Sequence, residues 1–302
     1  MASVKGVRSI EMDVANVARA ADFYSRVWNL TEVERRSGSV YLRGTGRTHH
    51  ILALHPAKGQ PAFRRMVLDG GDRNNVEAIH AQVVKALGEV GPPRALDWPG
   101  GGWGFGFKDA ERRNIFVVCD VADHADAADV ADRPRKIAHV NVNSADHKAC
   151  AQFFSDALGF RVIDETGGLL FMHCDNADHN SIVISKDSRG TVNHVAFEMP
   201  DLDSVMRGAG RMKDNGYPIE WGVGRHGAGN NVFAYFAGPE EFPIEITGEV
   251  MQVGPDYVPH GPEFWKFPPG RADQWGVTAP HTPRWKRIQD MFGFSEGGDE
   301  AV

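Results

Sequence analysis

Cysteine is scarce in this chain of 302 residues, which contains three: Cys119, Cys150 and Cys174. They are widely spaced and odd in number, so they form no CxxC pair and no disulfide framework of the kind that stabilises small secreted domains. The first residues, MASVKGVRSIEMDV, also lack the apolar core of a signal peptide. Together these absences indicate a cytoplasmic protein.

Long apolar runs and an excess of positive charge are missing as well. No stretch reaches the roughly 20 apolar residues that cross a bilayer, which argues against a membrane protein. The net charge of −7 argues against nucleic acid as a partner, because that partner requires basic surfaces. The glycine run at 100–102 lacks the Lys-Ser/Thr pair of a phosphate-binding loop.

The composition is otherwise that of an ordinary globular protein, with 42% hydrophobic and 24% charged residues. Residues 7–14 alternate as a strand does, and residues 16–30 place apolar side chains at helical spacing. Strand-like runs and a second helical run at 74–91 follow, up to a strand-like run at 114–120. Residues 122–135 are rich in Ala and Asp, which is typical of a linker.

The order of elements repeats after this linker. Residues 24–30 (YSRVWNL) align with residues 154–160 (FSDALGF), and residues 107–111 align with residues 236–240, at offsets of 130 and 129 positions. A constant offset over most of a half indicates an internal duplication. We therefore expect an α+β protein with two homologous domains, each built from two βαβββ-like modules.

The expected domains are residues 1–130 and residues 131–290. The first is expected to be a metal-free scaffold and the second to be catalytic. Residues 251–302 are rich in Pro and aromatic side chains, too apolar for a disordered tail. We expect them to form an ordered C-terminal arm over the second domain.

The stretch 225–245, RHGAGNNVFAYFAGPEEFPIE, carries the clearest chemical signal. It ends on Glu245, a single carboxylate between Ile244 and Ile246 in a run that otherwise reads as buried. An ionised carboxylate in an apolar site is costly unless it has a partner. A metal ion is one such partner.

Two histidines on other predicted strands are candidates for the remaining ligands. His139 lies in IAHVNV and His194 in VNHVAF, both among apolar neighbours. One strand histidine is more often a hydrogen-bonded core residue than a ligand. Two imidazoles and one carboxylate, however, suit a non-haem Fe(II) site with open positions. The counterparts at the same offset in the first half cannot form such a triad: Ser9, Arg65 and Phe116.

These residues resemble a known family, the type I extradiol ring-cleavage dioxygenases of the vicinal oxygen chelate superfamily. That family includes catechol 2,3-dioxygenases and 2,3-dihydroxybiphenyl 1,2-dioxygenases. Its signature is a histidine, a hydrophobic stretch, a tyrosine, a proline turn and a ligand glutamate. Here it reads His226, residues 227–234, Tyr235, Pro239 and Glu245. The resemblance implies that paired modules form an incomplete barrel and that the C-terminal domain holds the metal.

The resemblance also implies a role for individual residues. His139, His194 and Glu245 match the iron ligands, His179 matches a pocket histidine that acts as acid and base, and His226 and Tyr235 match residues that hydrogen-bond the catecholate oxygens. The implied activity is Fe(II)-dependent extradiol (meta) cleavage of an aromatic diol with O2. Both oxygen atoms enter a muconic semialdehyde-type product, in aromatic compound catabolism. Mn(II) can replace Fe(II) at such a ligand set.

Several alternatives stay open at this point. The chain can be a glyoxalase-like isomerase or a 2-oxo-acid-type dioxygenase of the same superfamily, a metal-free aromatic-binding protein, or a scaffold whose triad no longer binds iron. The resemblance further implies a homo-oligomer, a tetramer or an octamer, with residues 251–290 as a contact. The identity of the diol is open. Four apolar residues near the site suit an apolar ring pocket or a core equally: Phe171, Met172, Phe197 and Phe233.

Overall fold

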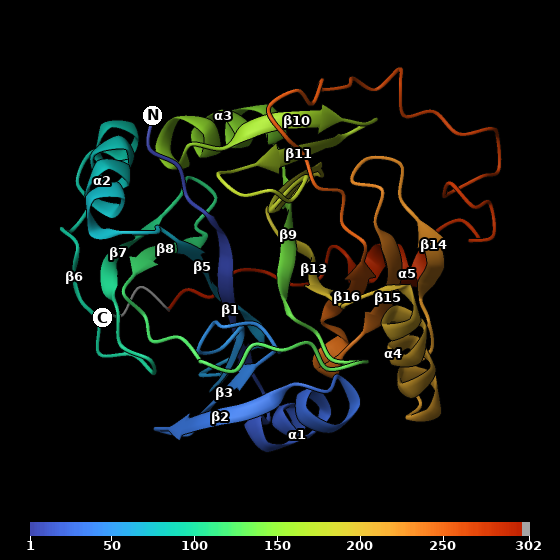
Figure 1. Ribbon diagram of the computed structural model, residues 1–302, viewed down its shortest axis with the longest axis horizontal. Helices are drawn as coiled ribbons and strands as arrows, with labels where there is room; N and C mark the ends of the chain where they lie inside the picture. Colours follow the sequence, from blue (N-terminus) through green and yellow to red (C-terminus); the bar gives the residue numbers. More distant parts are fainter. Residues whose placement is uncertain (298–302) are drawn as a thin grey trace.

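Two eight-stranded sheets form the protein, one from each half of the chain (Figure 1). The computed structural model describes residues 1–297; residues 298–302, the end of the expected arm, lie outside the described residues. The first sheet contains β1 (Gly6–Val14), β2 (Thr31–Arg36), β3 (Ser39–Arg43), β4 (Leu52–Pro56), β5 (Ala62–Asp69), β6 (Arg94–Ala95), β7 (Trp103–Lys108) and β8 (Asn114–Cys119). The second contains β9 (Lys136–Ser144), β10 (Arg161–Glu165), β11 (Leu169–His173), β12 (Ile182–Lys186), β13 (Val192–Glu198), β14 (Trp221–Arg225), β15 (Val232–Ala237) and β16 (Pro243–Gly248).

Helices connect the strands at equivalent places in the two halves. They are α1 (Val17–Asp22), which continues as the π-helix η1 (Phe23–Val27), α2 (Arg73–Leu87), α3 (His147–Leu158), α4 (Leu202–Asp214), the 3₁₀ turn η2 (Pro239–Glu241) and α5 (Pro283–Ile288). The predicted helices at 16–30 and 74–91 are thus confirmed. The first of them ends as a π-helix, which is wound more loosely than an α-helix. Among the described residues, no helix has the length and apolarity that a bilayer crossing requires.

The strand order confirms the predicted duplication. The first sheet runs β2-β3-β4-β1-β5-β8-β7-β6, and the second runs β10-β11-β12-β9-β13-β16-β15-β14. Adding eight to each strand number of the first order gives the second. In each sheet the two modules meet at an antiparallel central pair, β1 with β5 and β9 with β13. Neither sheet closes on itself, as expected of an incomplete barrel.

Short polar side chains start the helices of the second half. The Asp146 carboxylate accepts a hydrogen bond from the Ala149 N–H at the start of α3, and Asp201 does the same for Ser204 in α4. These are helix N-caps, which satisfy backbone donors that have no partner within the helix. Gly159 ends α3 with φ 75°, a left-handed conformation that glycine adopts without steric cost.

Side chains from both halves share one hydrophobic core. Helices α2 and α3 contact each other, and both lie at the top of Figure 1. Trp28 of the first half packs edge-on against Phe197 and Phe236 of the second, with ring centroids 5.3 and 6.2 Å apart. The first half therefore packs against strands β13 and β15 of the second half.

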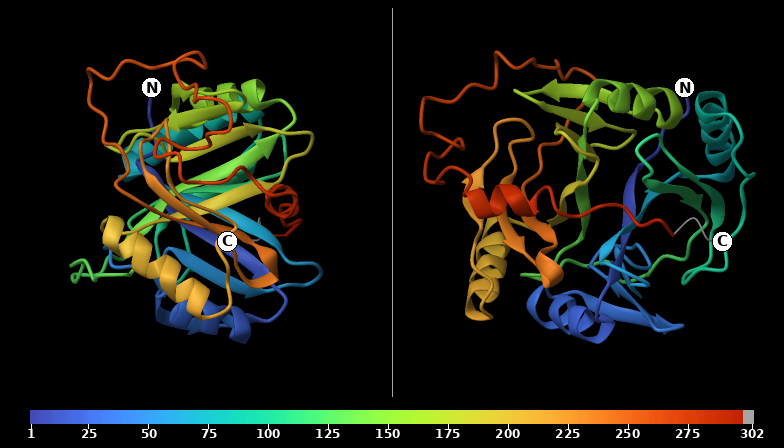
Figure 2. Two further views of the ribbon diagram at one scale, coloured as in Figure 1. Left: turned by 90° about the vertical axis from the view of Figure 1, so that its right-hand side faces the viewer. Right: turned by 180° about the vertical axis from the view of Figure 1, so that it is seen from behind.

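The C-terminal part of the chain leaves β16 as an irregular arm, as expected. In Figure 2, the orange and red arm passes over the second half to α5, and the chain then crosses to the first half. We call residues 291–296 the C-terminal strap. Its Phe292 carbonyl accepts from the Val192 N–H of β13, and its Gly293 carbonyl accepts from the Phe63 N–H of β5. The strap therefore hydrogen-bonds to both sheets.

Candidate metal centre

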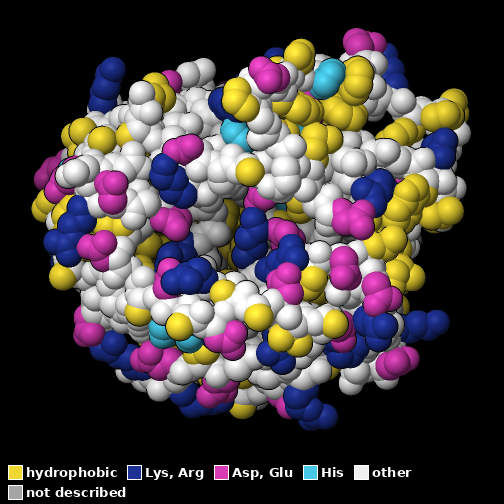
Figure 3. Space-filling view, in the orientation of Figure 1, with side chains coloured by type: hydrophobic (Ala, Val, Ile, Leu, Met, Phe, Trp, Pro, Cys, Tyr) yellow, Lys and Arg dark blue, Asp and Glu magenta, His cyan; other side chains and the backbone are white. Residues whose placement is uncertain are grey.

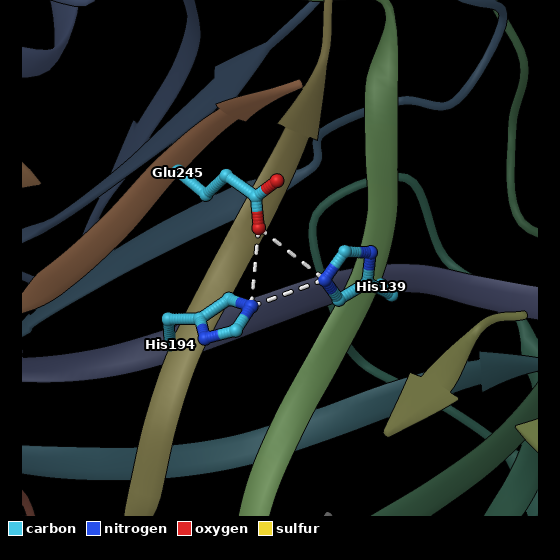
Figure 4. Close-up of side chains that lie close together, drawn as sticks. All are labelled: His139, His194 and Glu245. Carbon is cyan, nitrogen blue, oxygen red and sulfur yellow. Dashed lines mark hydrogen bonds and ion pairs between the residues drawn. The ribbon is translucent and has the colours of Figure 1, made fainter. Parts of the chain in front are cut away.

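Three adjacent strands of the second sheet bring the predicted ligands together. Ala196 of β13 lies opposite both His139 of β9 and Glu245 of β16, and His194 is two residues away on the same face. The two Nε2 atoms are 3.1 Å apart, and Glu245 Oε2 lies 3.4 Å from His139 Nε2 and 3.1 Å from His194 Nε2 (Figure 4). All three residues are buried and form a group of the kind that can hold a metal ion.

The donor set fits a divalent cation. Asn193 Oδ1 lies 2.8 Å from His194 Nδ1, so that nitrogen carries the proton and Nε2 is left with a free lone pair. Glu245 Oε2 is buried, and apart from the two imidazole nitrogens it has no hydrogen-bond partner in the structure. Two imidazole nitrogens and one carboxylate oxygen that point at one position are the ligand types of a 2-His-1-carboxylate site.

The protonation states also suit metal binding. Burial alone raises the pKa of Glu245, but the hydrogen bonds and charges of His139 and His194 outweigh it and hold the pKa well below its usual range. Burial lowers the pKa of His194. At neutral pH the site therefore contains a carboxylate and a neutral imidazole, the forms that bind metals.

Asn231 holds the carboxylate in place. Its Nδ2 donates to Thr247 Oγ1 at 2.7 Å and approaches Glu245 Oε1 at 3.4 Å. The structure places Asn231 in the cavity wall with a direct contact to the triad. Outer contacts of this kind orient a ligand and are part of a metal site.

A cavity of about 300 Å³ lies beside the triad, and both predicted diol-contacting residues line it. His226 Nε2 is 2.9 Å from the Tyr235 hydroxyl. Burial lowers the pKa of His226 to about 4. Burial and the charge of Glu245 raise the pKa of Tyr235 well above its usual value. Between pH 5 and 9, His226 is therefore neutral and Tyr235 keeps its hydroxyl proton.

Aromatic stacking fixes these two side chains. Phe233 stacks on His226 with ring centroids 3.9 Å apart, and Trp221 stacks on Phe233 at 4.3 Å and on Tyr235 at 5.1 Å. Trp221 also lines the cavity. A preorganised wall of this kind needs little rearrangement when a flat ring enters.

His179 does not occupy the expected position. The resemblance implies a pocket residue, but His179 lies in the turn between β11 and β12. Its side chain is fully buried and lies outside the set of cavity-lining residues. Nε2 is 2.7 Å from Asp164 Oδ2, and Nδ1 is 2.9 Å from Asn180 Oδ1. Its neighbour Asn180 lines the cavity instead. A direct acid–base role of His179 has no support in this geometry.

The cavity wall is more polar than expected. Of the four apolar residues considered, Phe171 lines the cavity, whereas Met172 and Phe197 are core residues without exposed surface. Amide side chains take their place in the wall: Asn141, Asn143, Asn180, Asn193, Asn231 and Gln289. A signal for two of them was present in the sequence. Asn141 and Asn143 follow His139 at steps of two residues, and side chains at such steps share one face of a strand.

The first half has no equivalent centre among the described residues. Ser9 lies opposite Val67, and Val67 lies opposite Phe116. This register matches that of His139, Ala196 and Glu245, so the predicted counterparts are confirmed. Arg65 lies over the rings of Trp98 and Phe116, at 5.2 and 4.8 Å from their centroids. Arg65 and Phe116 thus occupy the first-half positions that correspond to the ligands His194 and Glu245.

Comparison with known proteins agrees with this duplicated architecture. The family model of the Glyoxalase/Bleomycin resistance protein/Dioxygenase superfamily matches residues 6–115 and 136–246. The solved structure of the Mn(II)-bound glyoxalase from Novosphingobium aromaticivorans is 34% identical, with a TM-score of 0.85 and a coverage of 94% of each chain.

Two curated relatives carry dioxygenase names. Metapyrocatechase 2 of Cupriavidus necator is 31% identical over 153 residues, which are 49% of this chain and 46% of that protein. The match thus spans about half the length of that relative. The manganese-dependent 2,3-dihydroxybiphenyl 1,2-dioxygenase of Geobacillus genomosp. 3 is 24% identical over 276 residues, 83% of this chain and 87% of that protein. With both halves matched, the chain belongs to the Glyoxalase/Bleomycin resistance protein/Dioxygenase superfamily.

Proposed function

We propose that this protein is an extradiol dioxygenase that cleaves a catecholic ring with O2 and depends on Fe(II) or Mn(II). The observation that carries the proposal is the position of the triad. His139, His194 and Glu245 all come from the second half, and the cavity beside them presents His226 and Tyr235. The names of the two curated relatives, a metapyrocatechase and a dihydroxybiphenyl dioxygenase, support the same reaction class.

The residues of the triad would hold the metal through His139 Nε2, His194 Nε2 and a Glu245 oxygen. When bound, the metal supplies Lewis acidity that favours the deprotonated diol, and open positions at which both reactants are held together. Fe(II) and Mn(II) both suit this ligand set. The dihydroxybiphenyl dioxygenase is described as manganese-dependent, and the N. aromaticivorans structure as Mn(II)-bound.

The side chains of the cavity bind and orient the diol. Tyr235 keeps its proton and donates its O–H to an oxygen of the diol. Neutral His226 lies 2.9 Å from that hydroxyl and fixes its direction. In a site shielded from water, such a hydrogen bond to a charged oxygen is stronger than in bulk solvent. Positioning both reactants in one cavity makes the reaction effectively intramolecular.

The amide side chains of the cavity wall indicate which kind of substrate the cavity accepts. Asn143 and Gln289 hydrogen-bond within the wall, but Asn180 Nδ2 is buried without a partner. A purely hydrocarbon substituent leaves that donor unpaired, which is unfavourable. We therefore propose a catechol whose substituent carries hydrogen-bonding groups. Turnover of a panel of catechols, compared by kcat/KM, tests this, and a preference for unsubstituted biphenyl diols contradicts it.

The proposal also covers the organisation of the protein. We propose residues 1–130 as the scaffold domain and residues 131–290 as the catalytic domain, in a homo-oligomer of the cytoplasm, either a tetramer or an octamer. Exposed apolar side chains on the arm support an intersubunit contact, among them Phe264 and Val277 at 60% and 73% exposure. Hydrophobic side chains gather over the arm at the upper right of Figure 3. Light scattering after gel filtration measures the assembly.

Anaerobic loading with Fe(II) or Mn(II), followed by addition of catechol in aerated buffer, tests the activity. The expected result is oxygen uptake equal to the diol consumed, with a yellow ring-fission product. His194→Ala is expected to abolish both signals. If it retains them, the ligand assignment is wrong. If the loaded wild-type protein cleaves none of a broad panel of diols, the proposed reaction is wrong.

A glyoxalase-like isomerase is the second candidate, because the relative with 34% identity carries that name. An isomerase of this kind consumes no oxygen. Oxygen uptake therefore separates the two candidates directly. An isomerase site that draws ligands from both halves conflicts with this chain, because Ser9, Arg65 and Phe116 occupy the equivalent first-half positions.

A further inference from the structure

Asn180 has an unusual combination of properties for an amide side chain. It is 4% exposed, it lines the cavity beside the triad, and its Nδ2 is buried without any hydrogen-bond partner. A buried donor left without a partner costs free energy. Such a group is therefore expected to have a partner in the functional state. A reactant in the cavity that Asn180 lines can supply that partner.

The other end of the same amide is held firmly. His179 Nδ1 lies 2.9 Å from Asn180 Oδ1, and His179 Nε2 lies 2.7 Å from Asp164 Oδ2. Burial raises the pKa of Asp164, but the hydrogen bonds from His179, Tyr257 and the His260 N–H outweigh it and lower the pKa. Asp164 is therefore a carboxylate that accepts the Nε2–H. This carboxylate stabilises the imidazolium form of His179, in which Nδ1 also carries a proton. That Nδ1–H donates to Asn180 Oδ1, which turns the amino group of Asn180 away from His179.

The C-terminal arm completes this arrangement. The Tyr257 hydroxyl donates to Asp164 Oδ2 at 2.7 Å, and the His260 N–H donates to Asp164 Oδ1 at 2.7 Å. The His179 N–H donates to the Met251 carbonyl at 2.8 Å. The turn that carries Asn180 is thus bound to the arm through its backbone, and its His179 side chain is linked to the arm through Asp164. This gives the arm a function in the site.

Asn180 also lies close to the triad. The Ser181 carbonyl accepts from the Val140 N–H, directly after His139 in β9. A Cβ added to Gly229, where φ is +80°, would lie 3.5 Å from Asn180 Oδ1 and 3.0 Å from Asn231 Oδ1. Asn231 in turn contacts Glu245. The Asn180 amide therefore lies beside the loop that carries Asn231, whose side chain contacts Glu245.

The structure assigns to Asn180 a direct contact with a reactant: its Nδ2 donates a hydrogen bond to a negatively polarised oxygen atom in the cavity. That oxygen belongs either to the diol or to dioxygen. His179, Asp164 and Tyr257 are positioning residues that act through Asn180. This inference rests on the proposed function, and it replaces the direct role expected of His179 by an indirect one.

The first experiment compares wild-type, Asn180→Ala and Asn180→Asp proteins, loaded with Fe(II) without oxygen. Asn180→Asp keeps the shape and removes the donor. Titration with 4-nitrocatechol, followed by its absorption, gives Kd for the diol; titration with nitric oxide gives Kd for a dioxygen surrogate. Either Kd is expected to rise about 10- to 100-fold in both variants, because a hydrogen bond to a charged group is worth about 1.5–3 kcal/mol. The affected ligand identifies the source of the oxygen.

A matched control separates this contact from simple damage to the turn. Asn176 lies in the same turn outside the cavity, and its Nδ2 is within hydrogen-bonding distance of the Lys5 carbonyl, Cys174 Sγ and Ser181 Oγ. Asn176→Ala is expected to keep both Kd values within about threefold of wild type. If it reproduces the loss seen in Asn180→Ala, the effect comes from the turn and the inference fails.

The second experiment tests whether His179 acts through Asn180. His179→Leu is expected to weaken the same Kd in the wild-type background and to have no further effect in Asn180→Ala. His179→Gln, whose amide can still donate to Asn180, is expected to restore most of the affinity. Tyr257→Phe removes one hydrogen bond to Asp164 and keeps the assay possible if His179→Leu fails to fold. Metal content, measured on each protein, is expected to stay at the wild-type level.

The outcomes are distinguishable. If wild-type protein cleaves diols but both Asn180 variants keep the wild-type Kd for both ligands, the inference is wrong and the proposed function stands. Additive losses in the double variant would show that His179 does not act through Asn180. If wild-type protein binds metal but neither binds nor cleaves any diol, the proposed function itself fails.

Discussion

Arg65 lies opposite Glu11 across β1 and β5, at the register where His194 lies opposite Asn141 across β9 and β13. Arg65 Nε is 3.0 Å from Glu11 Oε2. Burial raises the pKa of Glu11, but Arg65 and His55 outweigh it and lower the pKa to about 2. The first half thus compensates its buried carboxylate with an arginine, whereas Glu245 is left with an oxygen for a metal.

Metal binding is therefore expected in the second half alone. Glu245→Gln removes a charged ligand and is expected to lower metal affinity by at least about tenfold. Glu11→Gln, a buried carboxylate of the other half, is expected to leave one metal ion per chain. Equilibrium dialysis followed by elemental analysis measures both. Equal metal content in Glu245→Gln and wild type would contradict the site.

The hydroxyl of Tyr235 is expected to affect catalysis and not metal binding. Tyr235→Phe removes the donor that faces the cavity, and kcat/KM for the diol is expected to fall about 10- to 100-fold. Metal content is expected to stay unchanged. Tyr24→Phe is the matched control, because the Tyr24 hydroxyl contacts Met12 Sδ in the core. A similar fall in Tyr24→Phe would mean that the assay reports general stability.

Stability is expected to fall on acidification between pH 6.5 and about 4. Burial lowers the pKa of His50 to about 3 and the pKa values of His226 and His281 to about 4. The unfolded chain binds these protons at a pH near 6.5, so their binding favours unfolding below that pH, and stability is greatest above it. The free energy of unfolding from urea titrations at pH 7.5 and pH 5 measures the loss.

A substitution isolates one of these contributions. His50→Gln is expected to remove about 2 kcal/mol of the decrease between pH 7.5 and pH 5, because that range covers about 1.5 pH units below the unfolded pKa. His147→Gln, at the partly exposed start of α3, is the comparison variant and is expected to leave the decrease as it is. An unchanged pH dependence in His50→Gln would contradict the assignment.

The C-terminal strap is expected to contribute strongly to stability. Phe292 is 5% exposed and packs edge-on against Phe242 with ring centroids 5.0 Å apart. Phe292→Ala is expected to lower the free energy of unfolding by about 3–5 kcal/mol, the usual cost of a buried phenylalanine. Phe264→Ala, at an exposed position of the arm, is expected to cost less than about 0.5 kcal/mol. Urea unfolding followed by fluorescence compares them.

Sequence alone predicted much of the fold and the triad because both follow from regular spacing. Alternation in β9, β13 and β16 places His139, His194 and Glu245 on one face, and the constant offset identified Ser9, Arg65 and Phe116 as first-half counterparts. Because these counterparts cannot form a metal-binding triad, the three second-half residues were the stronger candidates for metal ligands. In a regular strand, side chains alternate between the two faces with a period of two residues, so the sequence predicts which side chains meet.

In the turn before β12, the sequence did not predict which side chain faces the cavity. His179 and Asn180 are neighbours, and one faces the core while the other faces the cavity. In a segment without regular alternation, an error of one residue exchanges the two roles. The contact of Asp164 with Tyr257 and His260 spans more than 90 positions of sequence. No local pattern encodes such a contact, so the link between arm and site required the structure.

The C-terminal strap also has a consequence for the order of folding. The Ser295 N–H donates to the Phe63 carbonyl, and the Ser295 hydroxyl donates to Asp13. These contacts join the first half to a segment that is synthesised after the whole metal-binding half. Bringing together chain segments so far apart requires closing a long loop, which is slow and entropically costly. The half without metal is therefore expected to reach its final packing only after the half with the metal site has formed.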